Sequence, residues 1–152
     1  KFYLYRIYMR GANMADIKII VDSGSDIPQD IADKYNIGVI SFLSIFGTEQ
    51  YVQRTEITNE QFFDKLEEYD GIPTTSQTPF GDMLDYFKQQ CEEHESVIYF
   101  ALSSAASGQY QTANLVKSEI EEENPNADFH IVDTQKFSLY IAQTRRSCGA
   151  NG

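Results

Sequence analysis

Two short segments of this 152-residue sequence are rich in hydroxyl side chains: Thr74–Thr78 (TTSQT) and Ser103–Gly108 (SSAASG). Each comes just before a stretch with the apolar spacing of a helix. A helix N-terminus offers unpaired backbone N–H groups and a partial positive charge, and flanking hydroxyls add further donors. The pattern therefore favours a binding site for an anionic group. The same hydroxyls also cap helices in α/β proteins of any function, and this alternative stays open.

The charges near these segments indicate which kind of anion would bind. Neither segment contains Lys or Arg, and the nearest cation is Lys136. The phosphate-binding pattern GxxxxGK[ST] is absent, and Asp22 and Asp26, which follow an earlier predicted strand, would repel a polyphosphate. Neutral donors are better suited to a singly charged carboxylate.

Motifs for catalysis, metals and redox cofactors are missing from the sequence. Ala105 stands where a serine-hydrolase elbow GxSxG needs its first glycine, and Gly24 occupies the second acidic position of an aspartyl phosphotransferase motif. The two cysteines and two histidines lie far apart, without metal-ligand spacing. We therefore expect no catalytic residue, no metal and no cofactor.

The composition excludes two broad classes of function. With 12 Lys and Arg against 23 Asp and Glu, the net charge is −11, so a basic surface for nucleic acid is not expected. No apolar run approaches the roughly 18 residues of a membrane span. Because the cysteines form no CxxC pair, a reduced cytoplasmic setting is the expected location.

The elements that would position the hydroxyl segments follow from hydrophobic spacing. Buried strands are predicted at 17–21, 39–46, 97–102 and 129–132, with helices at 26–35, 58–69, 79–91 and 108–123. Asp26 is the expected N-cap of the first helix, and Thr58 with Gln61 forms a capping box for the second. The apolar stripe of that second helix, Phe62, Phe63, Leu66 and Tyr69, is assigned to the core. Alternating strands and helices predict an α/β fold: a parallel sheet with helices on both faces.

In such a fold the segments after the strands meet at one edge. Ligands bind outside the carboxyl ends of parallel strands, where the following helices begin. The strands ending at Val21, Leu102 and Val132 each lead into an Asp- or hydroxyl-bearing loop. We expect these loops, with Thr74–Thr78, to form one binding site.

Several motifs together resemble the DegV family of bacterial fatty-acid-binding proteins. They are Ile19–Pro28 (IIVDSGSDIP), Pro73–Gln77 (PTTSQ), Leu102–Ala113 (LSSAASGQYQTA) and Val132-Asp133-Thr134, in the family's order and spacing. The resemblance covers about residues 16–142. It implies an apolar tunnel for one long-chain fatty acid, and a role as the binding subunit that presents this lipid to a separate fatty acid kinase.

The resemblance also implies which residues bind the carboxylate. Carried onto this chain they are Thr75 and Ser104, with Ser103 next to them. Residues of the supporting loops are Asp22, Ser23, Ser76, Ser107 and Gly108. The family's usual glycine after the two serines is replaced by Ala105, and Ala106 follows it, which would change the loop if a positive φ were needed there.

The resemblance gives the domain organisation as well. Residues 16–142 correspond to the first lobe of a two-lobed family, 1–15 to an N-terminal extension outside the fold, and 143–152 to a tail or truncation remnant. The second lobe, which closes the tunnel, has no counterpart in the sequence.

Two alternatives to lipid binding remain. One is an enzyme that acts on a small phosphorylated or carboxylated substrate at the same loops. The other is an inactive fragment that associates with itself through the apolar surface that a second lobe would cover.

Overall fold

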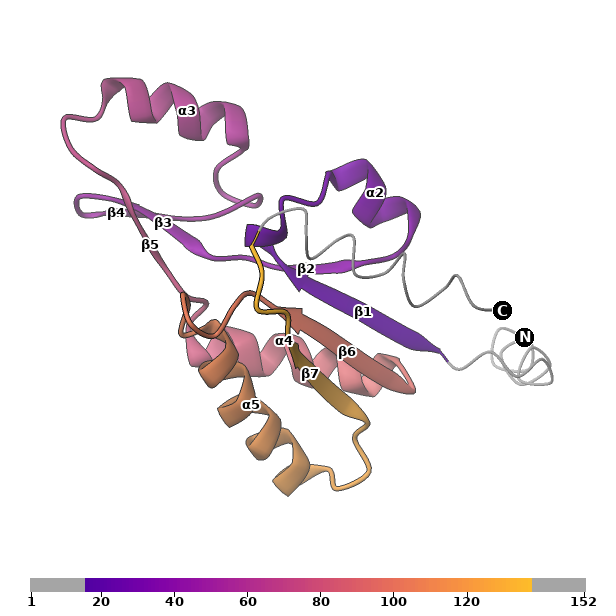
Figure 1. The fold of residues 1–152 in the computed structure, drawn as a ribbon. Coiled ribbons are helices and arrows are strands. Elements are labelled where there is room, and N and C mark those ends of the chain that lie inside the picture. Colours follow the sequence, from indigo (N-terminus) through magenta and orange to yellow (C-terminus); the bar gives the residue numbers. More distant parts are fainter. Residues whose placement is uncertain (1–15, 138–152) are drawn as a thin grey trace.

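A four-stranded parallel sheet forms the centre of the protein. The computed structural model describes residues 16–137; the predictions for 1–15 and for positions beyond 137 lie outside this range. The sheet contains β1 (Ile17–Asp22), β2 (Gly38–Ile40), β6 (Ser96–Ala101) and β7 (Phe129–Asp133), in the order β2-β1-β6-β7 (Figure 1). All three pairings are parallel, which confirms the predicted α/β fold.

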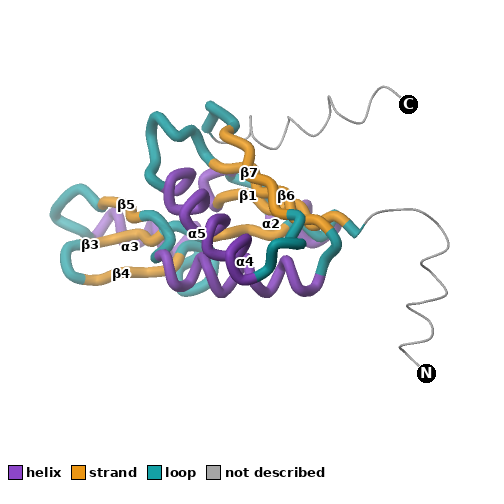
Figure 2. The backbone as a smooth tube through the Cα atoms, turned by 90° about the horizontal axis from the view of Figure 1, so that it is seen from below, coloured by secondary structure: helices purple, strands orange, loops and turns teal. Residues whose placement is uncertain are grey.

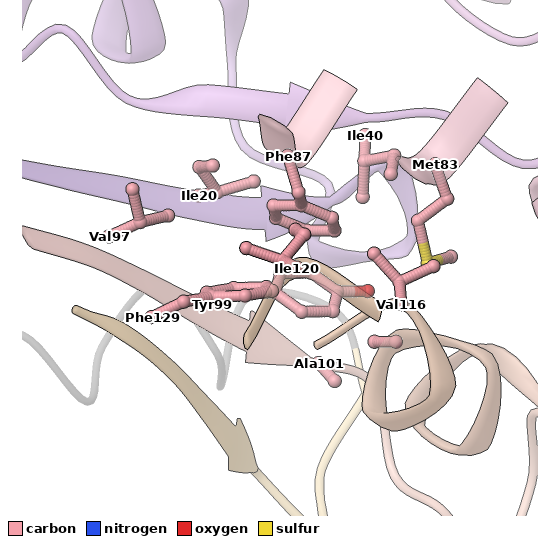
Figure 3. Close-up of a cluster of buried hydrophobic side chains, with 11 residues drawn as sticks. Ile20, Ile40, Met83, Phe87, Val97, Tyr99, Ala101, Val116, Ile120 and Phe129 are labelled. Carbon is pink, nitrogen blue, oxygen red and sulfur yellow. The ribbon is translucent and has the colours of Figure 1, made fainter. Parts of the chain in front are cut away.

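Helices cover both faces of this sheet, each above its own apolar cluster. On one face α4 (Phe80–Glu93) and α5 (Gln109–Glu123) contribute Met83, Phe87, Val116 and Ile120 to a cluster with buried strand residues (Figure 3). On the other face Ala32 of α2 (Gln29–Lys34) belongs to a smaller cluster. The continuous apolar runs of the strands reflect burial on both sides.

A second, antiparallel sheet was not predicted. It consists of β3 (Leu43–Phe46), β4 (Glu49–Val52) and β5 (Thr74–Ser76), in the order β4-β3-β5, and α3 (Asn59–Glu68) lies beside it (Figures 1 and 2). The single strand expected at 39–46 is therefore wrong. The chain leaves the parallel sheet after Ile40. The backbone N–H of Phe42 donates to the Ser23 hydroxyl (3.0 Å) and not to a backbone carbonyl of β1.

Three local predictions need correction. Asp26 is not a helix N-cap: its φ is 52°, it closes a 3₁₀ turn (Ser23–Ser25), and α2 begins three residues later, after Pro28. The predicted loop Thr74–Thr78 is a strand over its first three residues, because Thr75 pairs with Ser44 in β3. Pro79 is the N-cap of α4 and not its first helical residue.

The helix α3 is correctly placed but is not part of the core. Its capping box is confirmed: the Thr58 hydroxyl accepts from the backbone N–H of Gln61, whose side chain accepts from the backbone N–H of Thr58. Its aromatic stripe packs only on the narrow second sheet, where Phe62 contacts Phe46 edge to face. A three-stranded sheet is too small to cover the stripe, and Phe63 is 61% exposed.

Candidate functional site

The sheet order creates a crevice where the two central strands end. In the sheet, β1 has β2 as its neighbour on one side and β6 on the other. The connection that follows β1 leads to β2, and the connection that follows β6 leads to β7, so the two connections run in opposite directions from the centre of the sheet. Divergence of this kind leaves an open space beyond the carboxyl ends of the strands. Both strands end on the side of the molecule where the second sheet lies (Figure 1).

A pocket of about 490 Å³ lies at this crevice. Its floor includes Gly24, which follows β1, and Leu102, which follows β6. We call two segments of its lining the walls of the pocket: Thr75–Gln77 and Ala106–Gly108. Five of the predicted site residues line this pocket: Ser23, Thr75, Ser76, Ser107 and Gly108.

The other predicted serines lie elsewhere in the same loop. The Ser104 hydroxyl donates to the Asp133 carboxylate at 2.5 Å, and its backbone N–H donates to the same group at 3.2 Å. These hydrogen bonds hold the pKa of Asp133 below its usual value. Ser103 is buried and shapes the turn, since its carbonyl accepts from the N–H groups of Ala106 and Ser107. Neither serine is among the pocket-lining residues.

Asp22 lies behind the pocket and not in its lining. It is fully buried, and its carboxylate accepts hydrogen bonds from the Tyr99 hydroxyl and from the backbone N–H of Leu102. Burial raises the pKa of Asp22 from 3.8 to about 6, although the hydrogen bonds oppose this. The carboxylate therefore ties the end of β1 to the end of β6, which fixes the pocket floor.

Four polar residues that sequence reasoning missed connect the parts of the site. Gln53 accepts from the Ser23 hydroxyl (2.8 Å) and donates to that of Ser44 (3.0 Å), which joins the two sheets. The other three, Gln77, Gln109 and Thr112, join the two walls of the pocket. The sequence carries one signal for Gln77 and Gln109, their position within the hydroxyl motifs.

The pocket lining carries an acidic side chain and no basic one within the part of the chain that the structure describes. Asp26 is a charged residue of the lining, and the lining within residues 16–137 includes no Lys, Arg or His. In the same range, no three His, Cys, Asp or Glu side chains gather as a metal site requires. Between residues 16 and 137, no helix combines the length and apolar character that crossing a membrane requires.

A second hollow adjoins the first. It measures about 850 Å³ and lies between the start of α2 and α3, with Ile27, Ile57 and Phe62 among its apolar lining residues. Ser23 and Gln53 line both spaces, so the hydrogen bond between their side chains lies at the boundary.

Comparison with known proteins identifies the family. The sequence model of the DegV family matches residues 16–144. This chain belongs to the DegV family. A DegV domain-containing protein of Clostridium perfringens is 33% identical over 119 residues, which are 78% of this chain and 42% of that protein. The chain thus spans less than half the length of this curated DegV relative.

Solved DegV structures have the same fold. A stearic acid-binding protein from Eubacterium ventriosum has a TM-score of 0.80 at 23% identity, covering 91% of this chain and 48% of that one. A Thermotoga maritima protein with a described fatty acid binding function has a TM-score of 0.75 at 28% identity, covering 88% and 48%. In both comparisons this chain covers 48% of the other chain.

Proposed function

We propose that this chain binds a long-chain fatty acid, with the carboxylate in the pocket beyond β1 and β6. The observation that carries the proposal is the composition of the pocket. Hydroxyl groups line both of its walls, the apolar side chains of Phe42, Leu102 and Phe137 lie among them, and the lining within 16–137 has no cation. A carboxylate attached to an apolar chain is the ligand class that such a lining fits.

The relatives support the same ligand class. The Thermotoga maritima protein described as binding fatty acid is 28% identical over a shared fold. Because this chain spans about half of that protein, the affinity and chain-length preference of a full-length DegV protein are further proposals. So is presentation of the lipid to a fatty acid kinase, which rests on the family resemblance.

Within the pocket we assign the carboxylate to Thr75 and Ser107, one on each wall. Ser23 also lines the pocket, but its hydroxyl donates to Gln53, so it supports the site without a proton for the carboxylate. Ser104 can take part only if its hydroxyl leaves Asp133, since a hydroxyl has one proton to donate. Ser103 supports the site indirectly, because the turn that its carbonyl stabilises positions Ser107. Ser76 and Gly108 shape the walls.

The role proposed for the chain is non-catalytic. The alternative, an enzyme that uses these loops, would need an acid or base that acts on a substrate. Asp22 is buried behind the pocket with Tyr99 and Leu102 as its donors, and Asp26 is an acidic residue of the lining. Turnover of a phosphorylated or carboxylated compound without any partner protein, abolished by Asp22→Asn, would favour the enzyme. A cytoplasmic location stays a prediction from the cysteine usage.

Lipid extraction and titration test the proposal. Organic extraction of the purified protein, followed by mass spectrometry, should release a fatty acid. Titration with palmitate should show binding that the methyl ester of palmitate does not match, because the ester cannot be an anion. Thr75→Ala and Ser107→Ala should each weaken palmitate binding about tenfold, the usual size of a hydrogen bond to a charged group.

The matched control is Ser118→Ala, which removes a hydroxyl from the exposed side of α5, where it donates to the Asn114 carbonyl. This variant should bind palmitate as the wild type does. Equal affinity for palmitate and its ester, or equal affinity in all of these variants, would refute the proposed site.

A further inference from the structure

Two glutamines join the two walls of the pocket. Gln109 is fully buried at the first turn of α5, and Gln77 lies at the end of the Thr75–Gln77 wall. Neither was assigned a role in the sequence analysis, and neither is needed as a donor in the proposed binding mode. Their contacts nevertheless determine how far apart the two walls stand.

The Gln109 carboxamide both accepts and donates a hydrogen bond at Thr78. Its carbonyl oxygen accepts from the backbone N–H of Thr78 (3.0 Å), and its amide nitrogen donates to the Thr78 hydroxyl (2.9 Å). That hydroxyl has its own proton on the Ser41 carbonyl (2.8 Å), so it can only accept from Gln109. The Gln109 side chain also acts on the Asp22 carboxyl, whose pKa it lowers against the larger effect of burial. A carboxamide supplies both the acceptor and the donors that this position needs.

Gln77 makes the second connection. Its amide nitrogen donates to the Thr112 hydroxyl (2.8 Å), one turn beyond Gly108 in α5. The carbonyl oxygen of the same side chain lies against Gly108, where an added Cβ would stand only 2.3 Å from it. A glycine at 108 therefore allows the two walls to approach, and its φ of −71° is one that any residue adopts. A Cβ at this position would displace the end of the Gln77 side chain, without strain in the backbone.

From these contacts we infer that Gln77 and Gln109 are positioning residues that fix the separation of the Thr75 and Ser107 hydroxyls and so set the affinity for a carboxylate. The inference rests on the proposed function. Its physical basis is preorganisation: two donors that already stand at the right separation lose little freedom when the anion binds. If the walls separate, each hydroxyl can still reach a carboxylate oxygen, but not both at once.

The main test is Gln109→Glu, which keeps the shape of the side chain and removes its amide protons. Burial and the nearby Asp22 carboxylate raise the pKa of a glutamate at this position, with the Tyr99 hydroxyl alongside. Once ionised, the glutamate cannot donate to the Thr78 hydroxyl, whose own proton is on the Ser41 carbonyl. We expect palmitate to bind about tenfold more weakly than to the wild type at pH 8. As the pH falls to 5, protonation returns one donor, and the ratio of the two dissociation constants should approach one.

The ratio of the variant's dissociation constant to that of the wild type is the quantity to compare between pH values, because protonation of palmitate itself changes both constants alike. If Gln109 serves only to stabilise the fold, the folded variant will have a lower free energy of unfolding and a ratio near one at every pH. That result would overturn the inference. Circular dichroism at each pH establishes the folded fraction.

A second variant covers the case in which Gln109→Glu does not fold. Thr112→Val is nearly isosteric and removes only the partner of Gln77, so it should fold and bind palmitate several-fold more weakly; unchanged affinity would overturn the role of Gln77. The control is Gln90→Glu, the same substitution at a buried position of α4 away from the pocket. It should leave the dissociation constant unchanged. Failure of the wild type to bind palmitate would refute the proposed function itself, a different outcome from equal binding by all variants.

Discussion

Replacing the buried Asp22 with asparagine is expected to remove a pH dependence of stability. Asp22 is inaccessible to solvent at the junction of β1 and β6. Burial disfavours its charged form more than the Tyr99 and Leu102 donors favour it, so the pKa of its carboxyl is about 6 in the folded chain, against 3.8 ordinarily. A raised pKa means that the folded protein keeps the proton to a higher pH than the unfolded chain does.

The sign and size follow from this difference. Below pH 3.8 the carboxyl is protonated in both states, and its contribution to stability is complete. As the pH rises toward 6, the unfolded chain loses the proton first, so the free energy of unfolding falls. The total loss is about 3 kcal/mol, and about half of it occurs between pH 5 and pH 8. Above pH 8 the contribution of Asp22 no longer changes.

Urea unfolding of the wild type and Asp22→Asn at pH 5, 6, 7 and 8 measures this contribution. The difference between the two proteins cancels the titration of all other carboxyl groups, and Asp30→Asn, at an exposed position of α2, is the matched control. Between pH 5 and pH 8 the free energy of unfolding of the variant should fall by about 1 to 2 kcal/mol less than that of the wild type. Its absolute stability can differ, since asparagine offers one acceptor oxygen to the two donors. Parallel pH curves for wild type and variant would refute the reasoning.

Three further predictions concern the fold and its surface. Thr58→Ala removes the capping box of α3 and should lower the free energy of unfolding by about 1 kcal/mol, measured in urea; Asn59→Ala should change it far less. Phe87→Ala should lower the free energy of unfolding by about 3–5 kcal/mol in the same assay. The Phe87 ring is buried, and its centroid lies 4.6 Å from that of Phe129 and 5.1 Å from that of Tyr99. A decrease below about 1 kcal/mol would mean that this cluster is not the core. The Leu115 side chain is 64% exposed on α5, and we expect such apolar surface to favour self-association. The mass measured by light scattering should therefore rise with protein concentration, and it should rise less for Leu115→Ser. A mass that stays constant would argue against self-association.

The parallel sheet could be predicted because its signals are local. The run at 97–102 is continuous and apolar, and the run at 17–21 is interrupted only by Lys18, as is typical of strands covered on both faces. Thr58 and Gln61 are three residues apart, and the capping box that they form involves no other part of the chain. Physical causes that act over a few residues can be read from the order of those residues.

The second sheet could not be predicted for the opposite reason. β3 pairs with β4 across a tight turn but also with β5, about 30 residues further along, and β5 looks like a polar loop because its TTS sequence has no apolar alternation. The same limit explains Phe63. Its spacing marks an apolar helix face, but only the narrowness of the sheet beneath that helix determines that the side chain stays exposed.

For the site, the sequence by itself determined which residue types stand at the ends of the strands: hydroxyls and acids without a neighbouring cation. The tertiary structure decided which of them face the pocket. Ser107 lines the pocket, whereas Ser104, three residues earlier, is turned to Asp133, and Asp22 is engaged by Leu102, 80 residues away. A side chain's direction depends on the partners that long-range pairing places beside it. Local order does not contain those partners, so the types of the site residues were predictable and their roles were not.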